Sequence, residues 1–169
     1  AEIGLERAAF LARAEARHAA TLGRGNAAAE GGQPGPRIAD RVREGEAVLV
    51  QAVKDAMGEK GVRVTTALTL PGRHLVYTPT RSEIAVSRRI EDEAERDRLT
   101  GLVAEVARPG EGFILRTAAV GAGAEALARD AEYLRALWAG VQDRRAAAKP
   151  PALVHQDLAP VPRVRSEER

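Results

Sequence analysis

The chain has 169 residues, a length that suits one ordinary domain or two small ones, and 44% of them are hydrophobic and 30% charged. This balance predicts a globular protein, and no apolar run approaches the roughly 20 residues of a membrane-spanning helix. The lack of cysteine excludes disulfides, a thiol nucleophile and cysteine-ligated zinc within these residues. The start lacks the basic and then apolar segments of a signal peptide, so we expect a cytoplasmic protein. Because it begins with Ala1 instead of Met, we expect a piece of a longer chain.

The kind of basic residue says more than the net charge of +2, since the chain has 23 arginines and three lysines. The planar guanidinium group suits bidentate contacts to phosphate. A coding bias toward Arg and Ala explains the same composition, and both explanations stay open. Aromatic residues make up only 3% of the chain, so a platform of stacked bases is not expected. Any binding of nucleic acid would therefore rely on phosphate contacts.

The amino-terminal part predicts strands joined by tight turns. Residues 2–10 predict a short strand that runs into a turn, and the Ala-, Gly- and Arg-rich stretch at about 11–36 predicts a flexible loop. Strands are predicted at 47–53, at 62–70 and from His74 onward, with glycine-containing turns between them. Strand, turn, strand, turn and strand indicate an antiparallel meander, a unit from which small barrels are built.

The carboxyl-terminal part changes to a helical period. Apolar residues recur at helical spacing over 91–107 and again from Glu125 to about Arg145, with a short buried strand at 112–117 between the two helices. A last strand is possible at 152–155, and the Pro-rich tail at 159–169 is expected to be disordered. We therefore predict an α+β protein in which a β meander is followed by an α/β unit.

Two basic segments are candidate phosphate contacts. Lys60 is predicted at the tip of a hairpin, where a lysine can reach a phosphate backbone or can simply be a solvated turn residue. Arg88 and Arg89 precede the acidic start of a predicted helix at Glu91. They can pair with the acidic residues there, or one guanidinium group can clamp a phosphate.

Arg116 and Thr117 are the most suggestive pair. They follow a predicted strand and precede Gly121, Gly123 and the start of a helix, a place where α/β units gather anions. Arginine offers two parallel donors and threonine a hydroxyl group. A small-molecule phosphate or nucleotide site at 121–123 stays open as an alternative. The three histidines show no metal-ligand spacing, and no catalytic constellation emerges from the spacing of residues.

Several short segments, taken in order, resemble the amino-terminal half of the ribonuclease E/G family, which are bacterial single-strand endoribonucleases. The segments span most of residues 3–157. They are residues 3–10, 43–51, 54–58, 60–61, 65–66, 70–72, 87–90, 116–118 and 155–156.

This resemblance implies a partial OB-fold β-barrel of the S1 type over residues 1–66, followed by an α/β domain over 67–158 that senses the RNA 5′ end. It implies that Phe10 and Lys60 contact single-stranded RNA. The pocket for a 5′ monophosphate would comprise Gly72, Val76, Arg88, Arg116 and Thr117.

The resemblance also implies what these residues do not supply. The aspartates that bind Mg²⁺ in the family lie beyond the matching segments, so no catalytic residue and no metal or cofactor is assigned to this chain. We expect it to bind RNA and read its 5′ end without cutting it, either as part of an endoribonuclease or as a stand-alone non-catalytic RNA-binding module. Assembly into homo-oligomers is expected only for the whole enzyme.

Overall fold

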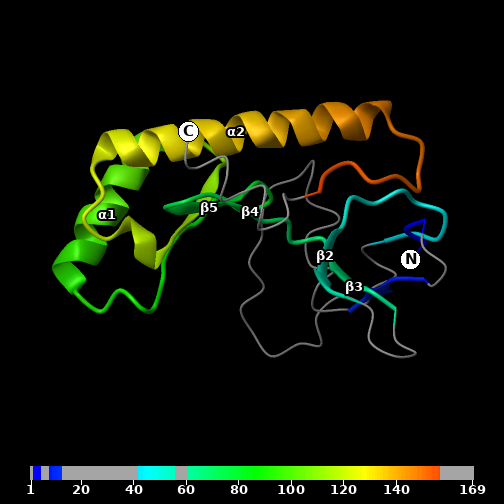
Figure 1. Cartoon of the computed structure of the whole chain (residues 1–169), viewed down its shortest axis with the longest axis horizontal. Coiled ribbons are helices and arrows are strands. Elements are labelled where there is room, and N and C mark those ends of the chain that lie inside the picture. The colour runs from blue at the N-terminus through cyan, green and yellow to red at the C-terminus, as the bar shows by residue number, and fades with distance from the viewer. Residues whose placement is uncertain (1, 5–7, 13–41, 56–60, 157–169) are drawn as a thin grey trace, which may run out of the picture.

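The computed structural model describes residues 2–4, 8–12, 42–55 and 61–156. Lys60, residues 13–36 of the predicted loop and the tail at 159–169 lie outside the described residues. The described residues form two mixed β-sheets and two α-helices, so the predicted α+β class is confirmed (Figure 1).

The first sheet is small and has the strand order β1-β3-β2. It comprises β1 (Phe10–Leu11), β2 (Gln51–Lys54) and β3 (Arg63–Thr65). β1 runs parallel to β3, and β2 pairs antiparallel with β3 across a register shift between Ala52 and Lys54. The antiparallel pairing of β2 with β3 confirms the predicted pairing of these strands, which are shorter than the predicted ranges 47–53 and 62–70. Of the residues described within the predicted strand at 2–10, only Phe10 is in a strand.

The second sheet has the strand order β4-β5-β7-β6. It comprises β4 (Leu70–Pro71), β5 (Leu75–Thr78), β6 (Ile84–Val86) and β7 (Gly112–Leu115). β4, β5 and β7 pair antiparallel in turn, whereas β6 runs parallel to β7. The strand from His74 and the buried strand at 112–117 are confirmed, and β6 was not predicted.

The predicted single meander is wrong, because its middle strand is divided between the two sheets. β3 ends at Thr65, whose hydroxyl oxygen accepts a hydrogen bond from the Ala67 N–H at 3.1 Å, a local turn that competes with strand pairing. The Gln51 side chain then pairs with the Thr69 backbone, accepting from its N–H and donating to its carbonyl, both at 2.9 Å. A side chain thus takes the place of a strand partner, and the chain crosses to the second sheet.

Helix α1 (Glu93–Val106) begins where the sequence predicts an acidic helix start. The Asp92 side chain caps it by accepting hydrogen bonds from the backbone N–H groups of Ala94 and Glu95 at 2.9 and 3.3 Å. Its buried residues Leu99 and Val103 are four positions apart and face the core.

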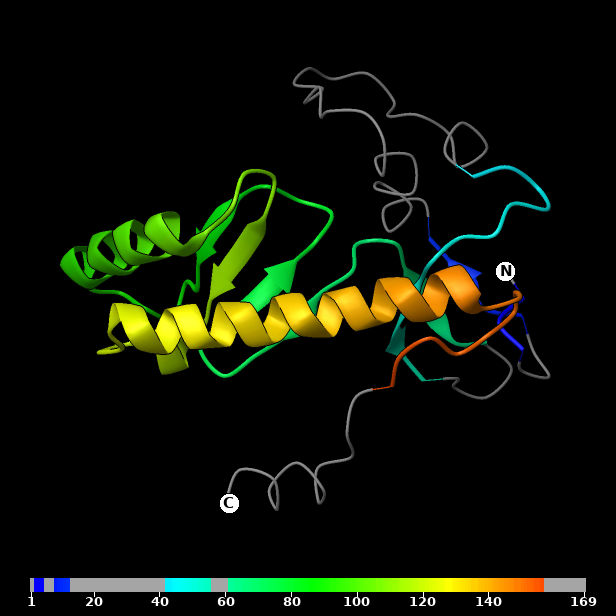
Figure 2. The ribbon, with the colours of Figure 1, turned by 90° about the horizontal axis from the view of Figure 1, so that it is seen from above.

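Helix α2 (Ala124–Ala147) buries a stripe of residues at spacings of three, four and seven. The stripe comprises Leu127, Ala131, Leu134 and Val141. The helix runs from the second sheet toward the first (yellow to orange in Figures 1 and 2). Beyond it, the residues at 152–155 form no strand, so that prediction is wrong.

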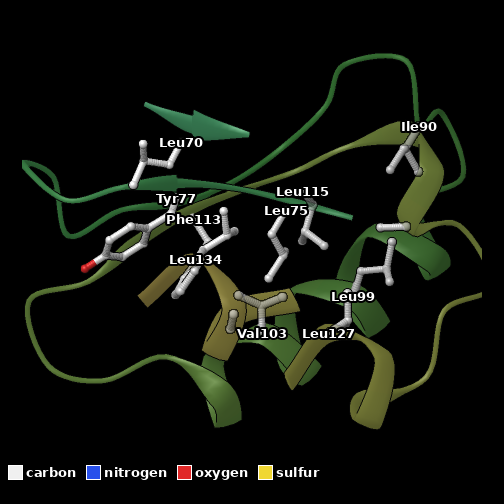
Figure 3. Packing of buried hydrophobic residues seen from close by; sticks show 12 residues of the cluster. Leu70, Leu75, Tyr77, Ile90, Leu99, Val103, Phe113, Leu115, Leu127 and Leu134 are labelled. Carbon is white, nitrogen blue, oxygen red and sulfur yellow. The ribbon is translucent and has the colours of Figure 1, made fainter. Parts of the chain in front are cut away.

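Both helices pack on one face of the second sheet, and their apolar stripes meet its buried side chains in a single core (Figure 3). Leu75, Tyr77, Phe113 and Leu115 alternate along β5 and β7 and point into this core, with the Tyr77 and Phe113 ring centroids 5.2 Å apart. Within the described part of the chain, neither helix has the length and apolar character required to cross a bilayer.

Candidate phosphate-binding site

Three chain segments meet at one edge of the second sheet. β6 and β7 are parallel neighbours, so the residues that follow Val86 and those that follow Leu115 leave the sheet at the same edge. β5 runs antiparallel to β7, and the tip of the β4–β5 hairpin, residues 72–75, therefore lies at this edge as well. Arg116 and Thr117 thus follow the strand beside the hairpin, and Arg88 follows the next strand along the same edge.

The turn that carries Arg88 is fixed by backbone and side-chain hydrogen bonds. The Ser87 N–H donates to the Leu115 carbonyl at 2.9 Å, which extends the β6–β7 ladder by one residue. The Ile90 N–H donates to the Ser87 carbonyl at 3.1 Å and closes the turn. From α1, Arg96 Nη1 donates to the carbonyls of Ser87 and Ile90 at 3.1 and 3.0 Å. The exposed Arg88 side chain is thus presented by a rigid turn.

Arg116 and Thr117 lie directly after β7 and are both exposed. The Arg116 N–H donates to the His74 carbonyl at 2.9 Å, and Arg116 Nη1 donates to the Gly72 carbonyl. Thr117 begins the short 3₁₀ helix η2 (Thr117–Ala119). The His74 ring nitrogen Nδ1 lies 2.8 Å from the Ala118 carbonyl oxygen. These contacts join the residues after β7 to the hairpin tip.

The arginines at this edge differ from four other arginines of the domain. Arg98, Arg108, Arg129 and Arg135 each form an ion pair with a glutamate. Arg88, Arg89 and Arg116 form no ion pair with any residue that the structure describes. The pairing of Arg88 and Arg89 with the acidic helix start is therefore absent from the described residues. A group of exposed guanidinium groups without counter-charges is suited to an anion.

Val76 and Gly72 complete the predicted set. Val76 pairs with Ile114, alternates with the core residues Leu75 and Tyr77, and so lies on the sheet face turned away from both helices. By the same alternation along β7, Arg116 follows the inward-facing Leu115 and lies on this outer face. The structure thus places Gly72, Val76, Arg88, Arg116 and Thr117 at or beside one edge of the sheet.

Nothing in the sequence pattern singled out Asp130, which contacts this hairpin from α2. A Cβ atom at Gly72 would lie 2.6 Å from Asp130 Oδ1, so only glycine allows the carboxylate to approach so closely. Asp130 lies 55 residues after Leu75, to which it is hydrogen-bonded. No local spacing pattern could therefore have linked the two residues.

The loop at 121–123 is less suited to an anion than its sequence indicates. The Gly121 N–H already donates to Glu95 Oε1 at 2.8 Å, and Arg98 Nη1 donates to the Ala122 carbonyl at 3.1 Å. Hydrogen bonds from the Arg98 side chain and the Gly121 N–H lower the pKa of Glu95 to about 2. A phosphate there would have to displace an ionised carboxylate, which argues against the nucleotide site at Gly121–Gly123.

The two predicted RNA contacts lie apart from this edge or outside the described residues. Phe10 is in the edge strand β1 of the first sheet, opposite Arg63 in the register, and 63% of its surface is exposed. Lys60 is outside the described residues. The described ranges contain no group of three or more His, Asp or Glu residues that could hold a metal ion.

Comparison with known proteins agrees with the resemblance seen in the sequence. A sequence model of the ribonuclease E/G family matches residues 69–168. Ribonuclease G of Escherichia coli K12 is 50% identical over 108 residues, and ribonuclease G of Haemophilus influenzae is 44% identical over 148 residues. Ribonuclease E of a Nostoc species is 40% identical over 110 residues.

These alignments cover 64%, 85% and 65% of this chain, but only 22%, 29% and 16% of the respective relatives. The chain therefore spans less than a third of the length of each relative. The matched region contains every segment that forms the edge described above, from the β4–β5 hairpin to α2. A family match over more than half of its length shows that this chain belongs to the ribonuclease E/G family.

Proposed function

We propose that this chain is the RNA-binding and 5′-monophosphate-sensing part of a bacterial endoribonuclease that acts on single-stranded RNA in RNA processing and decay. Its membership of the ribonuclease E/G family supports a role on RNA. The first sheet would be part of an OB-fold of the S1 type, and the second sheet with α1 and α2 the 5′-sensor domain. Hydrolysis would be carried out elsewhere in the whole enzyme.

The proposed pocket recognises a terminal phosphate by charge and by geometry. Arg88 and Arg116 approach from neighbouring parallel strands, and the Thr117 hydroxyl can donate a further hydrogen bond. A 5′ monophosphate presents several acceptor oxygens to these donors, whereas a 5′ hydroxyl offers one neutral oxygen. A triphosphate would fit the pocket less well because it is bulkier.

Val76 gives the pocket an apolar side. It is half-buried on the same outer face as Arg116. A nucleotide whose phosphate lies on the guanidinium groups could rest its sugar or base on this side chain without leaving a polar group unpaired. Gly72 contributes its carbonyl, which holds Arg116 at the edge.

Phe10 and Lys60 would contact the RNA away from its 5′ end. The exposed ring of Phe10 suits stacking with a base, a contact that tolerates any sequence because every base has a π-face. Lys60 would contact the phosphate backbone. Such contacts together would tether the RNA and favour its cleavage by positioning, with Mg²⁺ chemistry supplied by the family's aspartates outside this chain.

The observation that carries the proposal is the meeting of Arg88, Arg116 and Thr117 at one edge with no ion pair among the described residues. It is tested by titrating two single-stranded oligoribonucleotides that differ only in a 5′ monophosphate or a 5′ hydroxyl. We expect the wild-type chain to prefer the monophosphate by about tenfold or more, as charge-assisted hydrogen bonds allow. Arg116→Ala should abolish this preference.

Arg81→Ala is the matched control, because Arg81 is exposed in the turn after β5, at the opposite edge of the same sheet. It should keep the preference. Lys60→Ala should weaken binding of both oligonucleotides alike, and affinity should fall with salt at a log–log slope of about −0.7 per phosphate contacted. A preference that survives Arg116→Ala would refute the pocket.

The stand-alone RNA-binding module shares this pocket and differs only in having no catalytic partner. The titration does not separate the two. Incubating the chain alone with Mg²⁺ and monophosphorylated RNA tests the division of labour, and we expect no cleavage. Cleavage would show that these residues include a catalytic centre.

A further inference from the structure

We infer that Asp130 is the positioning residue of the 5′-phosphate pocket: it fixes the β4–β5 hairpin tip so that the tip can orient Arg116. The inference rests on the proposed function, since it assigns Asp130 a role in reading the 5′ end. Asp130 itself would not touch the RNA.

The Asp130 carboxylate binds three consecutive backbone N–H groups of the hairpin. Oδ1 accepts from Arg73 at 3.1 Å, and Oδ2 accepts from His74 at 2.7 Å and from Leu75 at 2.8 Å. Convergent backbone N–H groups form a concave site for an anion, and here a side chain of α2 fills it. Hydrogen bonds to an ionised acceptor are stronger than those between neutral groups, so the tip is held firmly to the helix.

The held tip makes two contacts with Arg116. The His74 carbonyl accepts from the Arg116 N–H at 2.9 Å, and the Gly72 carbonyl accepts from its Nη1 atom. Both carbonyls belong to residues that are bonded to Asp130 or lie against it. The carboxylate therefore controls where the backbone and the guanidinium group of Arg116 lie.

Gly72 gives independent support, because its lack of a side chain is explained by Asp130. A Cβ atom there would lie 2.6 and 2.7 Å from the two carboxylate oxygens. No real Cβ atom tolerates such contacts with a group held by three hydrogen bonds. Glycine is thus required at position 72 because the Asp130 carboxylate approaches so closely. The Gly72 carbonyl at the same time accepts the hydrogen bond from Arg116.

The charge of Asp130 is compatible with an anion site beside it. Its oxygens face the hairpin N–H groups, which compensate part of the negative charge. A hairpin held instead by an apolar contact would leave these three N–H groups to be satisfied in another way.

The test uses Asp130→Asn in the full chain, which keeps the shape but replaces one acceptor oxygen with an NH₂ group that faces backbone donors. We expect the preference for the 5′-monophosphate over the 5′-hydroxyl oligoribonucleotide to fall by about tenfold, with unchanged affinity for the hydroxyl form. Asp143→Asn, an exposed residue of the same helix, removes an equal charge and should keep the preference. If the Asn variant does not fold, Asp130→Ser serves instead, because its hydroxyl group brings one rotatable donor in place of the fixed NH₂ group.

A second readout separates positioning from a merely structural role. If Asp130 acts through Arg116, the double variant Arg116→Ala/Asp130→Asn should show the same monophosphate preference as Arg116→Ala alone, because the two effects are not additive. The amide NMR signals of Arg73, His74 and Leu75 should shift in Asp130→Asn. Equal loss of affinity for both oligonucleotides would mark Asp130 as structural only and overturn the inference.

The two proposals fail in different ways. If Arg116→Ala loses the preference and Asp130→Asn keeps it, the inference about Asp130 is wrong and the pocket stands. If Arg116→Ala keeps the preference, the proposed function is wrong, and the role inferred for Asp130 is then wrong as well.

Discussion

The two sheets use apolar residues in different ways. Every buried member of the main core cluster lies between Leu70 and Leu134, in the second sheet, the helices that pack on it and the segments that join them. In the first sheet, Phe10 and Val53 are 63% and 47% exposed, while Val64 is buried. The chain has two phenylalanines, and each sheet contains one of them.

The same residue type is thus buried in the core of one sheet and exposed in the other, where we propose that it contacts RNA. Phe113 is fully buried between Tyr77 and the helices, so its loss should be felt as lost folding free energy. An exposed ring adds little to folding but offers a flat apolar surface to a ligand.

The largest effect on stability is expected when the buried phenylalanine is replaced by alanine, and the same change at the exposed phenylalanine provides the comparison. Phe113→Ala should lower the free energy of unfolding by about 4 kcal/mol, because it removes a buried ring and leaves a cavity. Phe10→Ala should change it by less than about 0.5 kcal/mol and should instead weaken RNA binding. Urea unfolding followed by fluorescence of the single tryptophan, Trp138, measures the first effect.

Phe113→Leu, expected to cost about 1.5 kcal/mol, keeps the comparison measurable if the alanine variant does not fold. Equal destabilisation by Phe10→Ala and Phe113→Ala would show that the first sheet also depends on its aromatic residue for stability.

The next effect concerns the largely buried ion pair between Arg135 of α2 and Glu111 in the turn after α1. Arg135 Nη2 donates to Glu111 Oε2 at 2.6 Å and to the Val106 carbonyl at 2.8 Å, with side chains only 10% and 13% exposed. Burial raises the pKa of Glu111, but hydrogen bonds from Arg135 and the Arg108 N–H outweigh it and leave the pKa below its ordinary value. Arg135→Met should cost about 3 kcal/mol in chemical denaturation, because it leaves this carboxylate unpaired.

An exposed ion pair of the same helix provides the control. Arg129 and Glu125 pair with side chains 67% and 86% exposed, and Arg129→Met should cost less than about 0.5 kcal/mol. Adding Glu111→Gln to Arg135→Met should recover part of the loss, since it removes the stranded charge. Similar losses in Arg129→Met and Arg135→Met would contradict the role given to burial.

A smaller effect is expected where the chain passes from the first sheet to the second. Gln51→Ala removes the side chain that accepts from the Thr69 N–H and donates to its carbonyl. We expect a loss of about 1–2 kcal/mol and faster hydrogen exchange at the Thr69 amide. Thr69→Val, which removes only the 3.3 Å hydroxyl contact, should do less. Unchanged exchange in Gln51→Ala would show that this side chain does not secure the crossing.

Much of the second sheet and its helices could be predicted, because their apolar residues recur with the periods of strands and helices around one core. The division of the strand at 62–70 could not, because it depends on hydrogen bonds between Gln51 and a residue 18 positions away. β6 was missed because three residues are too few to show a period, and its pairing with β7 is decided by the fold.

The residues of the candidate site also fall into those that the sequence could predict and one that it could not. Arg88, Arg116 and Thr117 could be singled out from their places in the sequence, and the family resemblance added Gly72 and Val76. The grouping of these residues follows from strand order. Asp130 gave no signal, since aspartate in the second turn of a long helix is usually a solvated residue, and only the hairpin that folds against it reveals its role.

The smallest effect is a change of stability with pH, and it involves Glu95 and the loop that follows the candidate pocket. The Arg98 side chain and the Gly121 N–H lower the pKa of Glu95 to about 2 in the folded chain, from an ordinary value of 4.5. Because the folded pKa is the lower one, the stabilising contribution is complete above about pH 4.5 and is lost as the pH falls toward 2. Glu95→Gln should therefore be less stable than wild type at neutral pH, and the difference in unfolding midpoint should vanish by about pH 2. A difference that persists unchanged through this range would mean that shape, not charge, holds α1 to the loop, and that loop would then keep its place beside Thr117 in acid.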